Sequence, residues 1–271
     1  MNERKIKLYT ALFDQRASTP NSERRPNPVL RYPYCRCVTP AFPERAEWEG
    51  EPAVWGEWVG PKLHREIQYT SCQAWLALEA YVEKIASDGS EEFNPRVAIG
   101  SELWEQVVTL PSSFGKLQSV KYVGLYGSHL VRIPPEIGEM TNLEEFDPYT
   151  SYNLHWFPYE ITKCRKLQSS RVSTRALYGN YKYRPPFPRL PCEAPEIAPS
   201  SCSVCRGPFT SEGPHQVWIS LWVATDVLPL LVHACSGECI QNLPQPASGY
   251  VAKPHQGGLE LQQPPTSFGP L

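Results

Sequence analysis

The chain lacks several features that would assign it to a common functional class. Its 26 basic and 28 acidic residues leave a net charge of −2, too small to attract nucleic acid or an anionic membrane. No run of about 18 apolar residues marks a membrane span, and no apolar stretch near the N-terminus is typical of a signal peptide. The motifs G-x-S-x-G and H-E-x-x-H and the Gly-rich phosphate loops are missing too. We therefore expect a cytoplasmic protein that is not an enzyme and that binds another protein.

Proline and cysteine, in contrast, are abundant. The 29 prolines among 271 residues are about twice the average usage, which indicates that much of the chain is irregular. Nine cysteines are an odd number in a chain without an export signal. Because intracellular thiols stay reduced, closely spaced cysteines favour a metal site over disulfides.

One amphipathic helix is predicted from about residue 71 to residue 86. Ser71 is a suitable N-cap, and the sequence SDGS that follows the segment ends the helix. The apolar side chains recur at the spacing of one helix face: Trp75, Leu78, Val82 and Ile85.

Three similar units follow, at residues 110–132, 133–156 and 157–180. Each begins with an apolar residue and proline, and the units are almost equal in length. The apolar positions correspond between units: Leu117, Val120, Val123, Leu125 and Leu130 in the first, Met140, Leu143, Phe146 and Leu154 in the second, and Cys164, Leu167, Val172 and Leu177 in the third. This pattern resembles the leucine-rich repeat of the short bacterial and plant type, with its "IPPEIG"-like turns.

The resemblance implies a coil in which each unit contributes one short strand and stacked neighbours share a core. The chain departs from the pattern where the family usually has a hydrogen-bonding asparagine. That position is Ser128 in the first unit, Tyr152 or Asn153 in the second, and Arg175 in the third. A non-repeating βα arrangement is the alternative.

Repeat proteins of this kind bind partners through side chains on one face of the stacked strands. Aligning the units gives three columns on this face: Tyr122, Glu145 and Ser169; Gly124, Asp147 and Arg171; Tyr126, Tyr149 and Ser173. Tyrosines beside mixed charges suit protein recognition. We therefore predict a partner-binding face that consists of Tyr122, Tyr126, Glu145, Asp147, Tyr149 and Arg171. In the alternative, Asp147 pairs with Arg171 and Tyr126 stacks on Tyr149, with no role beyond structure.

Two cysteine pairs lie further along the chain. Cys202 and Cys205 are separated by two residues, and Cys235 and Cys239 follow after 29 intervening residues with three residues between them. Four thiolates in this arrangement match the tetrahedral, closed coordination that structural zinc prefers. The predicted order of turn, hairpin and short helix resembles the treble-clef class of zinc modules.

Other interpretations of these residues stay open. His233 is an alternative ligand in place of Cys235 or Cys239, and a redox role for Cys202 and Cys205 is a further alternative. A second metal site would combine Cys35 and Cys37 with His64 or Cys72. The alternative function is a nucleic-acid-associated zinc protein that uses the basic stretches KCRKLQSSR and YKYRPPFPR.

The expected fold class is thus α/β, a short leucine-rich-repeat solenoid with an irregular, helix-containing N-terminal region and a small zinc-binding module. The predicted segments are an irregular Pro- and aromatic-rich N-terminus (1–69), a helix with the N-terminal cap (70–109), the repeats (110–180), a Pro-rich connector (181–200), the zinc module (201–242) and a disordered tail (243–271).

Overall fold

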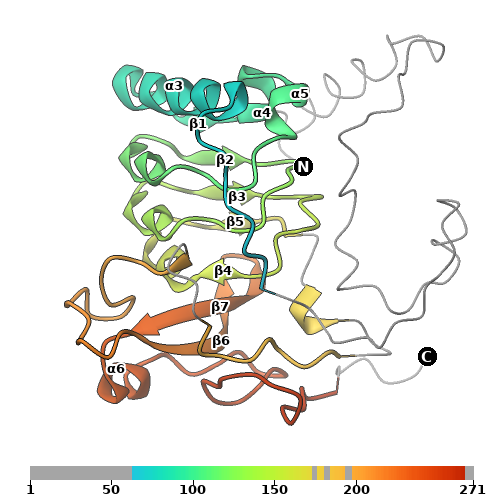
Figure 1. Cartoon of the computed structure of the whole chain (residues 1–271), viewed down its shortest axis with the longest axis vertical. Helices are drawn as coiled ribbons and strands as arrows, with labels where there is room; N and C mark the ends of the chain where they lie inside the picture. The colour runs from blue at the N-terminus through green and yellow to red at the C-terminus, as the bar shows by residue number, and fades with distance from the viewer. Residues whose placement is uncertain (1–62, 173–175, 180–183, 193–196, 266–271) are drawn as a thin grey trace, which may run out of the picture. The chain divides into compact units, whose positions relative to one another are not determined.

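The computed structural model describes residues 63–172, 176–179, 184–192 and 197–265, and these residues form a mixed α/β arrangement with few helices (Figure 1). One sheet is parallel, with the order β1-β2-β3-β5: β1 (Glu92–Phe93), β2 (Tyr122–Gly124), β3 (Glu145–Asp147) and β5 (Ser169–Ser170). The second sheet has the order β4-β7-β6: β4 (Phe157–Pro158), β7 (Asp226–Ala234) and β6 (His215–Val223). In the described part of the chain, no helix combines the length and apolar character needed to cross a bilayer.

The predicted amphipathic helix is α3 (Gln73–Asp88), and its four predicted apolar residues are buried. With Ser71 as the N-cap the helix would begin at Cys72, but it begins at Gln73. The N-cap is Cys72, whose sulfur accepts a hydrogen bond from the Trp75 backbone, so the prediction of Ser71 was wrong. Gly89 ends the helix with a φ of 69°, a conformation that favours glycine. Two short helices, α4 (Pro95–Ala98) and α5 (Ser101–Trp104), follow β1.

The three predicted units have the same local structure. Each starts at a proline that precedes a 3-10 helix: η2 (Ser112–Lys116), η3 (Pro135–Glu139) and η4 (Tyr159–Lys163). The parallel register pairs Tyr122 with Glu145 and Glu145 with Ser169. These three residues form the first column of the sequence alignment, so the strand register has the period that the sequence predicted.

A continuous apolar core runs from α3 through the three units to the hairpin of β6 and β7. Nearly all the predicted apolar positions of the units belong to this core. Leu167 is only partly buried and packs against the core, and Leu177 belongs to the second cluster described below. The hairpin contributes alternate residues, such as Leu221 and Leu230, to this core. Side chains on the hairpin's other face, including Trp218 and Leu231, form a second cluster with Trp156 and others.

The turn of the hairpin closes the free edge of the parallel sheet at β5. The Ser170 hydroxyl lies 3.0 Å from the Val223 carbonyl oxygen and 2.9 Å from an Asp226 carboxylate oxygen, and it can donate to either. The Ser170 amide donates to Thr225 Oγ1 at 3.1 Å, and the Thr225 hydroxyl donates to the Ser170 carbonyl at 2.8 Å. These contacts satisfy polar groups that an open strand edge would leave without partners.

The prediction of a disordered tail was wrong where the structure describes the tail. In the Pro-rich connector, Phe187 and Leu190 are buried in the second cluster. In the tail, the backbones of His255 and Trp218 exchange two hydrogen bonds of 2.8 and 3.1 Å, which pair the tail with the outer edge of β6. Packing on the hairpin overrides the polar composition of residues 243–265. The predicted residues Ser173 and Arg175 and segment 1–62 lie outside the described residues.

Candidate metal centre and partner face

Four cysteines from distant parts of the chain meet at one place, and they are the four that the sequence predicted: Cys202, Cys205, Cys235 and Cys239. Their sulfur atoms all lie within 4.8 Å of one another, and two of the separations are 3.5 and 3.6 Å. A tetrahedral zinc ion with Zn–S bonds of about 2.3 Å requires sulfur atoms about 3.8 Å apart. The cluster is therefore compatible with a metal site.

A tight backbone turn positions the first cysteine pair. The Arg206 amide donates to the Cys202 carbonyl at 3.0 Å, and the Cys202 amide donates to the Gly207 carbonyl at 2.9 Å. Arg206 adopts a φ of 63° to complete this turn, and the Gly207 amide points at the Cys205 sulfur at 3.4 Å. Backbone amides directed at sulfur stabilise its thiolate form.

The second pair comes from the end of β7 and from helix α6 (Gly237–Gln241). Cys235 directly follows β7, and its amide donates to the Cys202 sulfur at 3.3 Å. Ser236 caps α6 by accepting from the Cys239 amide at 3.3 Å, which places the Cys239 side chain in the first turn of the helix. The short helix thus returns the chain to the cluster.

The four thiols differ in their tendency to ionise. Burial opposes ionisation of Cys202, but backbone amides, among them those of Cys205 and Cys235, donate to its sulfur and lower its pKa to about 6. The pKa of Cys235 is raised to about 12, because its thiol hydrogen-bonds with the sulfurs of Cys205 and Cys239. Burial also raises the pKa of Cys239. Without a metal ion, Cys235 and Cys239 therefore keep their protons, and a bound cation displaces them.

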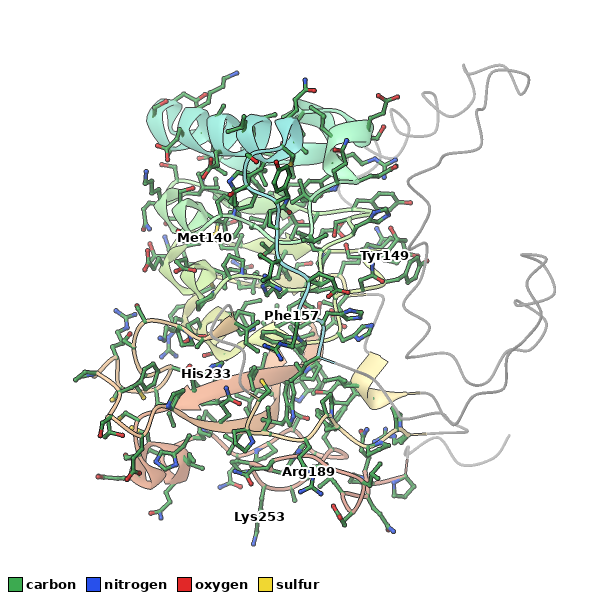
Figure 2. All side chains as sticks on the ribbon, in the orientation of Figure 1. Met140, Tyr149, Phe157, Arg189, His233 and Lys253 are labelled. Carbon is green, nitrogen blue, oxygen red and sulfur yellow. The ribbon has the colours of Figure 1, made fainter. Side chains whose placement is uncertain are left out.

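His233 lies beside the cluster on β7 (Figure 2) but is not one of the residues that the geometry groups together. Its side chain is 2% exposed, and burial lowers its pKa to about 4. Its backbone exchanges hydrogen bonds with Ser203 in the cysteine turn: the His233 amide donates to Ser203 Oγ at 3.1 Å, and the Ser203 amide donates to the His233 carbonyl at 2.8 Å. The close grouping of the four sulfur atoms, which leaves out His233, favours the four-cysteine set over one that includes His233.

The possible second metal site falls partly outside the described residues, because Cys35 and Cys37 are not described. His64 Nδ1 lies 2.9 Å from a Glu66 carboxylate oxygen, and the Cys72 sulfur caps α3. Both side chains therefore have structural contacts of their own.

The predicted partner face contains a row of two neighbouring aromatic side chains with a cationic side chain at each end. The rings of Tyr126 and Tyr149 lie 5.9 Å apart between centroids, and the Arg171 guanidinium lies 4.0 Å from the centre of the Tyr149 ring. Arg96, from α4, lies 5.6 Å from the centre of the Tyr126 ring. Figure 2 shows Tyr149 on this side of the stacked strands. The sequence pattern did not point to Arg96, which comes from an element outside the three units.

Two of the predicted face residues do not offer the open surface that we expected. Tyr122 is 8% exposed and Asp147 is 4% exposed. The Tyr122 ring lies over Gly124, so that a Cβ atom on Gly124 would be 2.9 Å from the Tyr122 hydroxyl oxygen. Burial raises the pKa of Tyr122, and the Asp147 charge adds to this effect. Tyr126, Tyr149, Glu145 and Arg171 are partly exposed.

Several basic side chains of the two basic stretches contact other parts of the chain. Arg184 lies 5.7 Å from the centre of the Tyr250 ring, and Arg189 pairs with Glu260 at 2.9 Å. From the first stretch, Lys166 donates to the Asn142 side chain at 2.6 Å.

A polar groove separates η3 and η4 from the segment that leads into the cysteine turn. It is lined by Pro135, Glu136, Gly138, Glu139, Glu160, Lys163, Pro199, Ser200, Ser201 and Arg206. Glu160 is 5% exposed and accepts a hydrogen bond from Ser203, which only partly offsets the rise in its pKa caused by burial. Through Ser203, the third unit is therefore linked to the turn that carries Cys202 and Cys205.

Comparisons with known proteins give little support for a family assignment. No family model matches the chain, and no curated protein matches it. A solved leucine-rich-repeat protein from Leptospira interrogans is 18% identical over 42% of this chain, with a TM-score of 0.22. The alignment covers 35% of that protein, and a TM-score of this size carries no argument about the fold. The chain is thus mixed α/β, with a parallel sheet and a cluster of four cysteines compatible with a metal site.

Proposed function

We propose that this chain is a non-enzymatic scaffold of the leucine-rich-repeat type that binds a protein partner, and that a structural zinc ion at the four cysteines stabilises it. The repeat assignment is supported by the strand register, which pairs equivalent positions of successive units, and by the 3-10 helix that follows a proline in each unit. Stacked units of this kind hold side chains on a rigid surface.

The observation that carries the binding role is the row formed by Tyr126, Tyr149 and Arg171. These partly exposed side chains are already ordered by contact with one another, so a partner that docks on them orders little more. Tyrosine and arginine are also the residue types enriched at energetically important positions of protein interfaces. The contact between Tyr126 and Tyr149 is the purely structural role that the sequence analysis left open as an alternative. Such a contact is compatible with docking of a partner.

Zinc is the proposed metal because four thiolates in a closed tetrahedral set suit it. The separations of the Cys205, Cys235 and Cys239 sulfurs are close to those that zinc requires. Metal binding at such a site contributes directly to folding, which matters for a hairpin held by a short turn and a five-residue helix.

The face is tested by cross-linking. A photoreactive phenylalanine analogue at position 149 should capture a protein partner in the cells that make this chain, and the same analogue at Tyr69 should not. Tyr69 is a suitable control because it is 71% exposed and lies outside the proposed face. A Tyr126→Ala/Tyr149→Ala variant should lose the same partner, as judged by quantitative pull-down. Equal capture from positions 149 and 69 would reject the face.

The nucleic-acid alternative receives less support, because Arg171, Arg184 and Arg189 are held by Tyr149, Tyr250 and Glu260. Retention on a nucleic-acid column that falls steeply with increasing salt would favour that alternative.

A further inference from the structure

Two cationic side chains face the polar groove beside the cysteine turn. Lys163 is the last residue of η4, and Arg206 directly follows Cys205. Both line the groove, and Lys163 interacts electrostatically with Glu160 first, then with Arg206, Cys202 and Glu139. Among the residues that the structure describes, neither cation has a carboxylate within ion-pair distance. Glu160 attracts Lys163 electrostatically without forming an ion pair with it.

We propose that Lys163 and Arg206 form a cationic outer shell that compensates the negative charge of the metal-loaded cysteine cluster. The inference rests on the proposed metal centre. Four thiolates around one divalent cation carry two more negative charges than the ion neutralises, and the two side chains supply two positive charges. Arg206 and Cys205 are exposed and Lys163 is half-buried, so water screens part of this attraction, and it acts over short distances only.

The arrangement explains why Lys163 and Arg206 are close together. The two like charges repel each other, while Glu160 and Glu139 attract Lys163. The loaded cluster adds a further negative centre, and Lys163 already interacts with Cys202, one of its four cysteines. The turn at Arg206, with its φ of 63°, fixes one cation to the ligand loop itself.

Three acidic residues also line the groove and oppose this effect: Glu136, Glu139 and Glu160. Burial raises the pKa of Glu136 and of Glu160, which favours their neutral forms. Glu160 in addition accepts a hydrogen bond from Ser203, so its carboxylate is directed to the cysteine turn. The nearby acids therefore weaken the cationic shell less than their number suggests.

The consequence is that metal binding joins the third unit to the hairpin. Lys163 belongs to η4 of the third unit, whereas Arg206 belongs to the cysteine turn. When the cluster is loaded, its charge attracts both, and the two parts of the chain are held together across the groove.

The test uses Lys163→Gln and Arg206→Gln in the full-length chain, with Lys166→Gln and Arg189→Gln as matched controls. Lys166 and Arg189 contact Asn142 and Glu260 and are not among the residues that line the groove. Zinc affinity is measured by competition with a chromogenic chelator, and cobalt(II) absorption reports whether four thiolates still bind the metal. We expect each test variant to bind zinc about 10-fold more weakly, the order of magnitude found for outer-shell partners. The cobalt spectrum should stay unchanged.

Charge-preserving variants separate charge from packing. Lys163→Arg and Arg206→Lys should retain most of the wild-type affinity. Unchanged zinc affinity in both glutamine variants would overturn the outer-shell role while leaving the metal centre intact. Failure of the wild-type chain to bind zinc or cobalt would instead reject the proposed metal centre itself.

Discussion

The hydroxyl oxygens of Ser128 and Ser151 lie 2.7 Å apart in the buried interior of the stacked units. Ser151 donates to the Leu125 carbonyl at 3.0 Å, and Ser128 Oγ accepts from the Leu130 amide at 3.4 Å. The two serines lie at equivalent places in successive units, at the position where the sequence pattern calls for asparagine. The prediction that Tyr152 or Asn153 is the counterpart of Ser128 in the second unit was wrong, because Ser151 takes that place. Thr150 turns the chain with a φ of 62°, and Ser151 is directed inward.

Removing one of these hydroxyls should destabilise the chain. Ser151→Ala leaves the Ser128 hydroxyl and the Leu125 carbonyl without this partner in a buried place, at a cost of about 1–3 kcal/mol. Ser87→Ala is the control, because the Ser87 hydroxyl is exposed, and it should change stability by less than about 0.5 kcal/mol. Urea unfolding measures both, and equal effects would contradict the role of the buried pair.

Close backbone contact between units predicts that Gly138 tolerates no side chain. A Cβ atom at Gly138 would lie 2.7 Å from the Glu160 carbonyl oxygen, so η3 and η4 would have to move apart. We expect Gly138→Ala to cost about 1–3 kcal/mol. In contrast, no atom lies within 4 Å of a Cβ at Gly237, and alanine there should be neutral or slightly stabilising. Thermal unfolding of the zinc-saturated proteins compares the two, and a neutral Gly138→Ala would show that the units are loosely packed.

The cysteine cluster predicts a metal stoichiometry and its loss on mutation. The purified chain should contain about one zinc ion, the number that one four-cysteine site holds. Cys202→Ser should abolish this binding, whereas Cys192→Ser should not, because Cys192 is not part of the cluster. Elemental analysis gives the content, and a chelator should lower the melting temperatures of the wild type and Cys192→Ser but not that of Cys202→Ser. Zinc retained by Cys202→Ser would reject the site.

Metal affinity should rise with pH. Metal-free Cys235, with a pKa of about 12, and Cys239, with a raised pKa, hold protons at neutral pH and must lose them to bind the ion. Lower pH therefore favours the metal-free state, and binding at neutral pH releases protons. Calorimetry in buffers with different ionisation enthalpies measures that release. An apparent binding enthalpy that is independent of the buffer would contradict these protonation states.

The tail should be ordered as far as its contacts with β6 extend. Because the backbones of Trp218 and His255 exchange two hydrogen bonds, their amides should be protected against hydrogen exchange. The exposed turn at Glu212 serves as a fast-exchanging reference. Truncation after Asn242 should also lower the melting temperature by about 5 °C or more, because it uncovers the Trp218 cluster. Rapid exchange at His255 would restore the prediction of a disordered tail.

Sequence patterns predicted those features of the structure that depend on residues close together in the chain. The spacing of Leu78 and Val82 on one helix face, the recurrence of apolar residues in the three units and the two cysteine pairs each reflect a geometry that a few neighbouring residues dictate. The proximity of Tyr126 and Tyr149 also followed, because a fixed period brings equivalent positions side by side.

Exposure and long-range contacts did not follow from these patterns. Tyr122 and Asp147 share the strand columns of exposed residues but are buried, and Arg96 reaches Tyr126 from outside the repeat. The tail also looked disordered, because its composition does not reveal that an open edge of β6 is available to it. Each of these depends on which surfaces meet after folding.

The sequence by itself determined the units, their period and the four cysteines, because side-chain spacing directly sets which residues share a face. Only the tertiary structure decided that Ser203 links Glu160 to the cysteine turn and that Lys163 lies near Cys202. These residues are far apart in the chain, and no local rule relates them. They come together because the hairpin completes the apolar core that the third unit leaves open.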